Sequence, residues 1–149
     1  GWGGSLRRAK EHGNILLTGA EKTELGILVF DVTSGPAGWV AENSELVAKF
    51  LQITANANAM WADETNHAKM LPLIAKDAGM DEAATADTMS TFVFPTVDSQ
   101  LSATWLGGGA QEFMKGVADV FVNAGSIDSA LNSYAGNVNT GPLAAARDM

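Results

Sequence analysis

The pattern of hydrophobic and polar positions predicts a chain that is mostly helical. Two stretches repeat apolar residues at three- and four-residue spacing, which is typical of an amphipathic helix. The first begins near Ser44 and runs to about Ala62, and the second runs from Ala110 to Ala124, where Gly125 ends it. The apolar face of the first helix consists of Leu46, Val47, Phe50, Leu51, Thr54, Ala57 and Trp61. We therefore expect Trp61, which shares this face, to pack inside the protein.

Capping and helix-breaking residues predict several shorter helices. These are a helix from Ser5 to His12 closed by a left-handed Gly13, a helix interrupted by Pro72 and ended by Gly79, a helix from Asp81 as N-cap to about Ser90, and a last helix over Ser126 to Ala135. The region around Pro95 is expected to be irregular, and the polar tail from Gly136 is expected to fray.

Two short segments, Asn14–Thr18 and Ile27–Thr33, have the composition of strands. The second holds four consecutive apolar residues followed directly by Asp31. Burying a carboxylate without compensation costs about 1–3 kcal/mol of free energy. Asp31 must therefore lie at the solvent-exposed end of the strand or pair with a cation. Two lone strands do not make a stable sheet. We therefore expect partner strands from outside this chain, as in a piece of a longer protein.

Composition and charge narrow the class of protein. The 149 residues are 46% hydrophobic and 17% charged, which is typical of one globular domain. The net charge is −8, and no cluster of Lys or Arg is larger than the pair Arg7-Arg8. This charge pattern argues against a surface that binds nucleic acid. Cysteine is absent, and no apolar run approaches the length of a membrane span.

Enzymatic chemistry has few candidates in this sequence. Asp63, Glu64 and His67 could be considered as metal ligands, but zinc needs further ligands that the sequence does not offer, and we interpret them as a solvated helix start. The run Gly107–Gly109 precedes a helix without a preceding strand, so we interpret it as loop geometry and not as a phosphate cradle. The sequence predicts neither an enzyme nor a cofactor or metal.

Trp2 differs from the other tryptophans because glycines flank it. Its ring could cover an ammonium group by cation–π attraction, or it could be buried against the neighbouring helix. An aromatic face and a carboxylate are what an amine ligand requires. Trp2 and Asp31 are thus a candidate pair. Trp105, in contrast, is expected to pack in the core.

A family resemblance adds to this interpretation. Trp2-Gly-Gly, NILLTG, FDVT, NSELVAKFL and FPTVDSQLSATWLG together resemble the C-terminal half of ABC-transporter substrate-binding proteins, most closely the taurine-binding branch of the nitrate/sulfonate/taurine family. Ser44 stands where that family usually has Pro. The resemblance implies part of an α/β type 2 periplasmic-binding-protein fold, helix-rich with one or two short strands. Residues 1–26 would end the second lobe, 27–36 would be the hinge crossover strand, and 37–149 would return to the first lobe.

The same resemblance implies a function. The protein would be the periplasmic component of an ABC importer, binding taurine or a related small amino-sulfonate and delivering it to a membrane permease. Asp31 would pair with the ligand's ammonium, and Trp2 would line the cleft. Thr33 and Ser34 are near enough to help bind the sulfonate, although hydroxyls of this kind often cap turns. The main sulfonate donors are expected in an N-terminal half of the same protein.

Two alternatives stay open at this stage. The first alternative is another ligand of the same family, such as an alkanesulfonate, nitrate or a thiamine-precursor pyrimidine. An alkanesulfonate or nitrate has no ammonium group and would leave Asp31 unexplained. The second is a non-catalytic helical interaction module, whose apolar faces recruit another protein.

Overall fold

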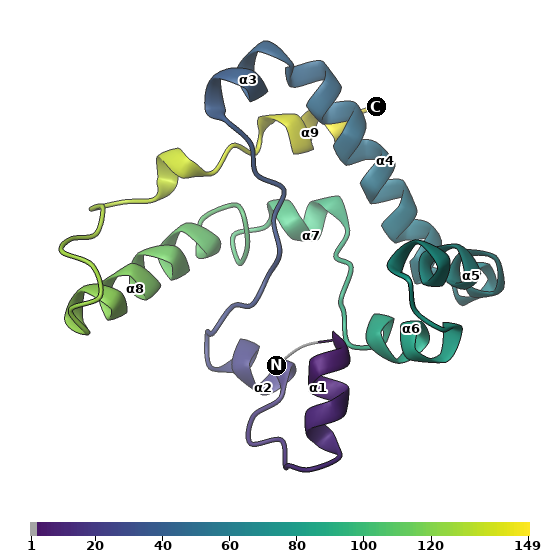
Figure 1. Cartoon of the computed structure of the whole chain (residues 1–149). Coiled ribbons are helices and arrows are strands. Elements are labelled where there is room, and N and C mark those ends of the chain that lie inside the picture. The colour runs from purple at the N-terminus through teal and green to yellow at the C-terminus, as the bar shows by residue number, and fades with distance from the viewer. Residues whose placement is uncertain (1–2) are drawn as a thin grey trace. The chain divides into compact units, whose positions relative to one another are not determined.

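The structure, a computed structural model, describes residues 3–149 and is built from helices without any β-strand in that range (Figure 1). The expected α/β type 2 periplasmic-binding fold is therefore wrong for this chain. The α-helices are α1 (Gly3–Lys10), α2 (Gly19–Glu24), α3 (Ala37–Glu42), α4 (Ser44–Ala62), α5 (His67–Ala78), α6 (Glu82–Met89), α7 (Val97–Leu101), α8 (Gly109–Asn123) and α9 (Gly141–Arg147). Two 3-10 turns, η1 (Glu64–Asn66) and η2 (Ala135–Asn137), complete the described elements.

The chain divides into two compact units. The first comprises Gly1–Thr18 and Asn56–Pro95, and the second comprises Gly19–Ala55 and Thr96–Met149. Helix α4 begins in the second unit and ends in the first.

The first unit is organised around α6, which packs against both α5 and α1. Local signals set the turn between α5 and α6. Gly79 adopts φ 64°, a left-handed conformation that favours glycine, and its amide and that of Met80 bond back to α5 carbonyls. Asp81 then caps α6, because its carboxylate accepts the Ala84 amide at 2.7 Å. The predicted roles of Gly79 and Asp81 are confirmed, and α5 continues through Pro72.

In the second unit, α7 packs against α9, which buries Pro142, Leu143 and Ala146. The other buried residues of this unit's helices are small, namely Ala48, Ala110 and Ala118. Among the described residues no large side chain is completely buried. The helices therefore enclose little core of their own.

The two long amphipathic helices are confirmed, since α4 spans Ser44–Ala62 and α8 spans Gly109–Asn123. Their apolar faces are nevertheless largely open. Phe50 on α4 and Phe121 on α8 are both more than half exposed. Helical periodicity thus predicts where these helices lie but not what covers them.

Several predictions near the ends of the chain are wrong. Helix α1 ends at Lys10, and Gly13 does not have a positive φ. Asn14–Thr18 forms no strand. The helix predicted for Ser126–Ala135 is absent, and the tail predicted to fray forms α9 instead. Burial of Pro142, Leu143 and Ala146 stabilises α9.

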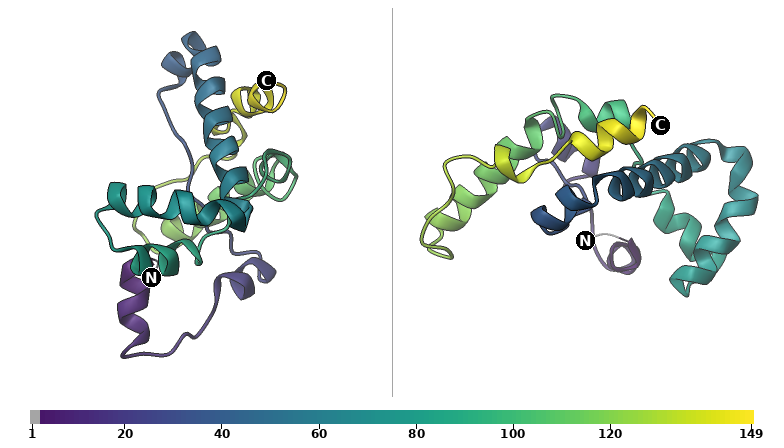
Figure 2. Two further views of the ribbon diagram at one scale, coloured as in Figure 1. Left: turned by 90° about the vertical axis from the view of Figure 1, so that its right-hand side faces the viewer. Right: turned by 90° about the horizontal axis from the view of Figure 1, so that it is seen from above.

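Two further views show the same picture, with helices joined by thin traces and no arrow anywhere in the described chain (Figure 2). None of the described helices combines the length and the hydrophobicity that crossing a bilayer requires.

Candidate functional site

The Asp31 segment, residues 27–36, is the longest non-helical connection in the first half of the second unit (Figure 1). Its entry is set by α2, because the Ile27 amide donates to the Lys22 carbonyl at 2.8 Å. Pro36 ends it, with φ −59° and ψ 128°, and immediately precedes α3. The strand predicted here is wrong as secondary structure, since no strand in the described chain pairs with it. Its side chains alternate only at the start, where Leu28 is 9% exposed and Val29 is 69% exposed, and from Asp31 to Gly35 every residue is exposed.

Phe30 anchors the segment through an aromatic cluster. Its ring meets Trp105 edge-on, with centroids 5.9 Å apart and planes at 86°, and Phe113 of α8 at 6.3 Å and 63°. Edge-to-face arrangements of this kind are favourable for aromatic rings. The packing role predicted for Trp105 is confirmed. The sequence did not reveal this cluster, because its three members are far apart in the chain.

A tight loop places Trp105. The Trp105 amide donates to the Ser102 carbonyl at 3.1 Å, and the Trp105 carbonyl accepts the Ala110 amide at 2.9 Å as α8 begins. Gly109 must be glycine here, because a Cβ atom would collide with the backbone carbonyl of Thr104. The interpretation of the glycine run as loop and helix-entry geometry is confirmed.

Asp31 is exposed and forms no ion pair or hydrogen bond with any described residue. It follows Phe30 directly, so in extended backbone its side chain leaves the opposite face from the aromatic cluster. Asp31 is therefore a solvated carboxylate at the wet end of an apolar run. A carboxylate of this kind is available to a cationic ligand.

The other predicted ligand-binding residues contribute less. Thr33 and Ser34 are exposed, and their hydroxyls form no hydrogen bond within the described chain, so neither caps a turn. Trp2 lies outside the described residues. Of the four predicted residues, the structure thus places Asp31, Thr33 and Ser34 together on the Asp31 segment.

The residues considered as metal ligands have local structural roles. The Asp63 carboxylate accepts from the Thr65 hydroxyl at 2.7 Å and the Thr65 amide at 3.0 Å, and these bonds lower the pKa of Asp63. The His67 ring stacks on Trp61 at 4.0 Å, and His67 Nε2 lies 2.8 Å from the Trp61 carbonyl oxygen. The described residues include no group of His, Asp and Glu that could hold a metal ion.

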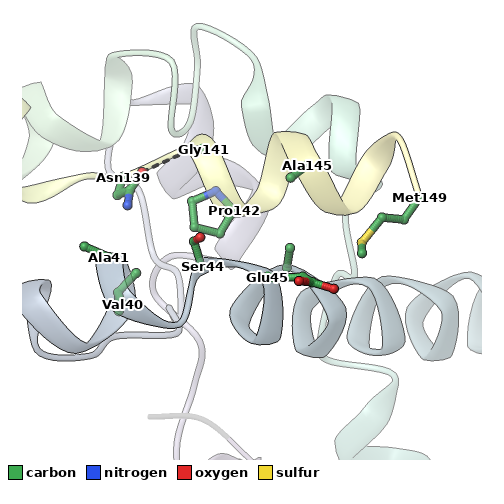
Figure 3. A pocket seen from close by; sticks show the side chains of 10 residues that line it. Val40, Ala41, Ser44, Glu45, Asn139, Gly141, Pro142, Ala145 and Met149 are labelled. Carbon is green, nitrogen blue, oxygen red and sulfur yellow. Dashed lines mark hydrogen bonds between the residues drawn. The ribbon is translucent and has the colours of Figure 1, made fainter.

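Helix α9 and the start of α4 border a hollow of about 490 Å³ (Figure 3). Apolar and small side chains form most of its wall, including Val40, Ala48, Pro142 and Met149. Two of its polar groups are engaged elsewhere, since Asn139 Oδ1 accepts the Gly141 amide at 3.0 Å and Glu45 pairs with a lysine of α4 at 2.7 Å. This lining suits an apolar group better than a zwitterion.

A second hollow of about 480 Å³ lies at the start of α8. Its lining includes Gln111, whose Oε1 is buried without a hydrogen-bond partner while its Nε2 donates to the Leu106 carbonyl at 2.7 Å. Lys115, which also lines it, is paired with Asp119. The hollow therefore offers an acceptor but no uncommitted lysine that would bind an anion.

No protein-family model, no curated protein and no solved structure matches this chain. The resemblance to taurine-binding proteins accordingly stays a prediction.

Proposed function

We propose that this chain contributes the ammonium-binding part of a substrate-binding component for an ABC importer, with taurine or a related small amino-sulfonate as ligand. The observation that carries the proposal is Asp31, an exposed carboxylate without a partner among the described residues, beside a residue that anchors its segment. The resemblance of FDVT, and of the helix start NSELVAKFL that follows it, to the taurine-binding branch of the family supports the same assignment. In this proposal the protein works in the periplasm and hands its ligand to a membrane permease.

The two charged ends of a zwitterionic ligand require different binding groups. An ammonium group donates charge-assisted hydrogen bonds to a carboxylate, and a sulfonate requires donors at the other end of the ligand. Thr33 and Ser34 can supply hydroxyl donors near Asp31, and the predicted N-terminal half would supply the rest. Alkanesulfonates and nitrate have no ammonium group for the Asp31 carboxylate to bind, so Asp31 would distinguish amino-sulfonates from them.

The exposure of Asp31 sets the affinity expected of this chain alone. Solvent-exposed ion pairs contribute about 0–1 kcal/mol, so the isolated Asp31 site should bind taurine with a dissociation constant of about 0.2 M or weaker. Tight binding would require the other half to exclude water around the ligand.

The experiment is a titration followed by amide chemical shifts in nuclear magnetic resonance. Taurine should shift the amides of Val29 to Ser34 with a saturable concentration dependence, and ethanesulfonate, which lacks the ammonium, should not. Asp31→Asn should abolish the taurine response. Asp128→Asn is the matched control, because Asp128 is another exposed aspartate of the same unit without a protein partner.

Three outcomes would refute this assignment. Taurine could leave the Asp31 segment unshifted, ethanesulfonate could shift it equally, or Asp31→Asn could respond to taurine like the unaltered chain. Each would remove the ammonium-binding role of Asp31.

A second candidate function is a non-catalytic helical interaction module. The exposure of large apolar side chains on α4 and α8 favours it, because surfaces of this kind mark protein contacts. Sedimentation and thermal melting distinguish the two candidates. A monomer that melts cooperatively favours a self-sufficient module, and an associating or non-cooperative chain favours one part of a larger protein.

A further inference from the structure

The backbone of the Asp31 segment carries an unused set of hydrogen-bonding groups. From Leu28 to Gly35 no backbone N–H or C=O forms a hydrogen bond with any described residue. Extended backbone presents these groups alternately on two edges, and each edge matches the edge of another extended chain. Residues 27–36 contain no turn or bend, so these free groups are available to pair with a neighbouring extended chain.

The side chains of the segment suit such a neighbour. Val29 and Val32 are 69% and 61% exposed, and both are β-branched residues that favour strands. Phe30 holds the segment against Trp105 and Phe113. The segment is therefore partly ordered before a partner binds, which reduces the conformational entropy lost on binding.

We propose that the Asp31 segment binds a β-strand of another polypeptide by strand addition, and that this partner strand carries a lysine or arginine beside Asp31. Main-chain hydrogen bonds would supply the affinity, and the side chains on alternate positions would supply the specificity. An unpaired extended backbone is a template for pairing in this way.

Charge complementarity decides between a foreign partner and a second copy of this chain. Asp31 is the one charged residue between Leu25 and Gly38, and the whole chain has a net charge of −8. Pairing two copies would bring two acidic chains and two Asp31 carboxylates to one ladder, and like charges in such positions are destabilising. A basic residue opposite Asp31 removes this repulsion.

The probe is an eight-residue peptide of alternating threonine and valine with lysine near its centre. We expect it to slow amide hydrogen exchange at every second residue of the Asp31 segment, along one edge. A peptide with N-methylated backbone amides should not bind, and replacing its lysine by glutamate should weaken binding several-fold.

Proline variants of the protein identify the edge. The amides of Val32 and Thr33 lie on opposite edges of extended backbone, and neither bonds within the described chain. Either Val32→Pro or Thr33→Pro should lower the peptide's affinity about tenfold, since proline removes one donor and blocks the edge, while the other variant stays within about twofold. Val93→Pro, at an exposed non-helical position of the first unit, is the control and should have no effect.

Four results would overturn the proposal. The peptide could fail to protect the segment at millimolar concentration, or the N-methylated peptide could bind equally well. Both proline variants could leave binding unchanged. Protection of the same amides in the chain alone, rising with its concentration, would identify a second copy as the occupant. The partner's basic residue and the ammonium of the proposed ligand would use the same Asp31 carboxylate, so they are alternative occupants of Asp31. None of these measurements uses taurine, and the two proposals can therefore fail separately.

Discussion

Truncation of Phe30 tests whether the aromatic cluster anchors the Asp31 segment. In Phe30→Ala the contacts of the ring with Trp105 and Phe113 are lost. Full burial of a phenylalanine corresponds to about 3–5 kcal/mol on truncation, and Phe30 is only half-buried, so about half of that applies. Two edge-to-face pairs add about 0.5–1.5 kcal/mol each in good geometry, and the longer Phe113 contact lies at the low end. We expect Phe30→Ala to lower the free energy of unfolding by about 2.5–4.5 kcal/mol.

The assay is urea unfolding followed by the amide signals of α8 in nuclear magnetic resonance, with hydrogen exchange measured across the Asp31 segment. Phe121→Ala is the matched control. It is the same substitution on α8 at a residue that is 51% exposed and has no ring contact in the described chain. It should cost less than about 1 kcal/mol, because alanine's helix propensity offsets part of the lost burial.

The reasoning fails if the two substitutions have equal effects, or if Phe30→Ala changes the free energy of unfolding by less than about 0.5 kcal/mol, the size of an ordinary surface substitution. Either result would mean that the ring contacts do not hold the segment in place.

Three further predictions concern local structure. Gly79→Ala should destabilise the protein by about 1–2 kcal/mol, because Gly79 has φ 64°. Gly116→Ala should instead stabilise it by about 0.5–1 kcal/mol, because the new Cβ inside α8 meets open space. Urea unfolding measures both changes in the free energy of unfolding. The hydrogen bonds from Thr65 lower the pKa of Asp63, so they stabilise the folded protein at pH values above 3.8, the ordinary aspartate pKa. This contribution is lost as the pH falls through the lowered pKa. In Thr65→Val the carboxyl titration followed by carbon resonances should move upward, and an unchanged pKa would contradict the assigned cause. Asp81→Ala should destabilise by about 0.5–2 kcal/mol through loss of the α6 cap, and Asp81→Asn, which keeps an acceptor, should lose clearly less; equal losses would argue against capping.

Locally encoded features are the part of the fold that the sequence predicts well. The bounds of α4 and the position of α8 follow from helical periodicity. Gly79 and Asp81 end one helix and begin the next through bonds within a few residues of themselves. Such interactions depend on neighbours in the chain, so composition and spacing are enough to find them.

Features that need a distant partner are predicted poorly. A strand is defined by a neighbouring backbone, and the Asp31 segment is extended without one in the described chain. Helix α9 has a short, weakly patterned sequence, and burial of Pro142, Leu143 and Ala146 is what stabilises it. The sequence signals for a strand and for a frayed tail were therefore wrong for reasons of tertiary contact.

The candidate site divides in the same way. Residue types and their order show that an acidic residue, Asp31, ends an apolar run and that the chain has no cysteine. Contacts between distant residues place Phe30 against Trp105 and Phe113, and they leave Asp31 exposed without a partner among the described residues. The physical reason is that residue type sets what a side chain can bind, whereas long-range packing sets which side chains remain free to bind it.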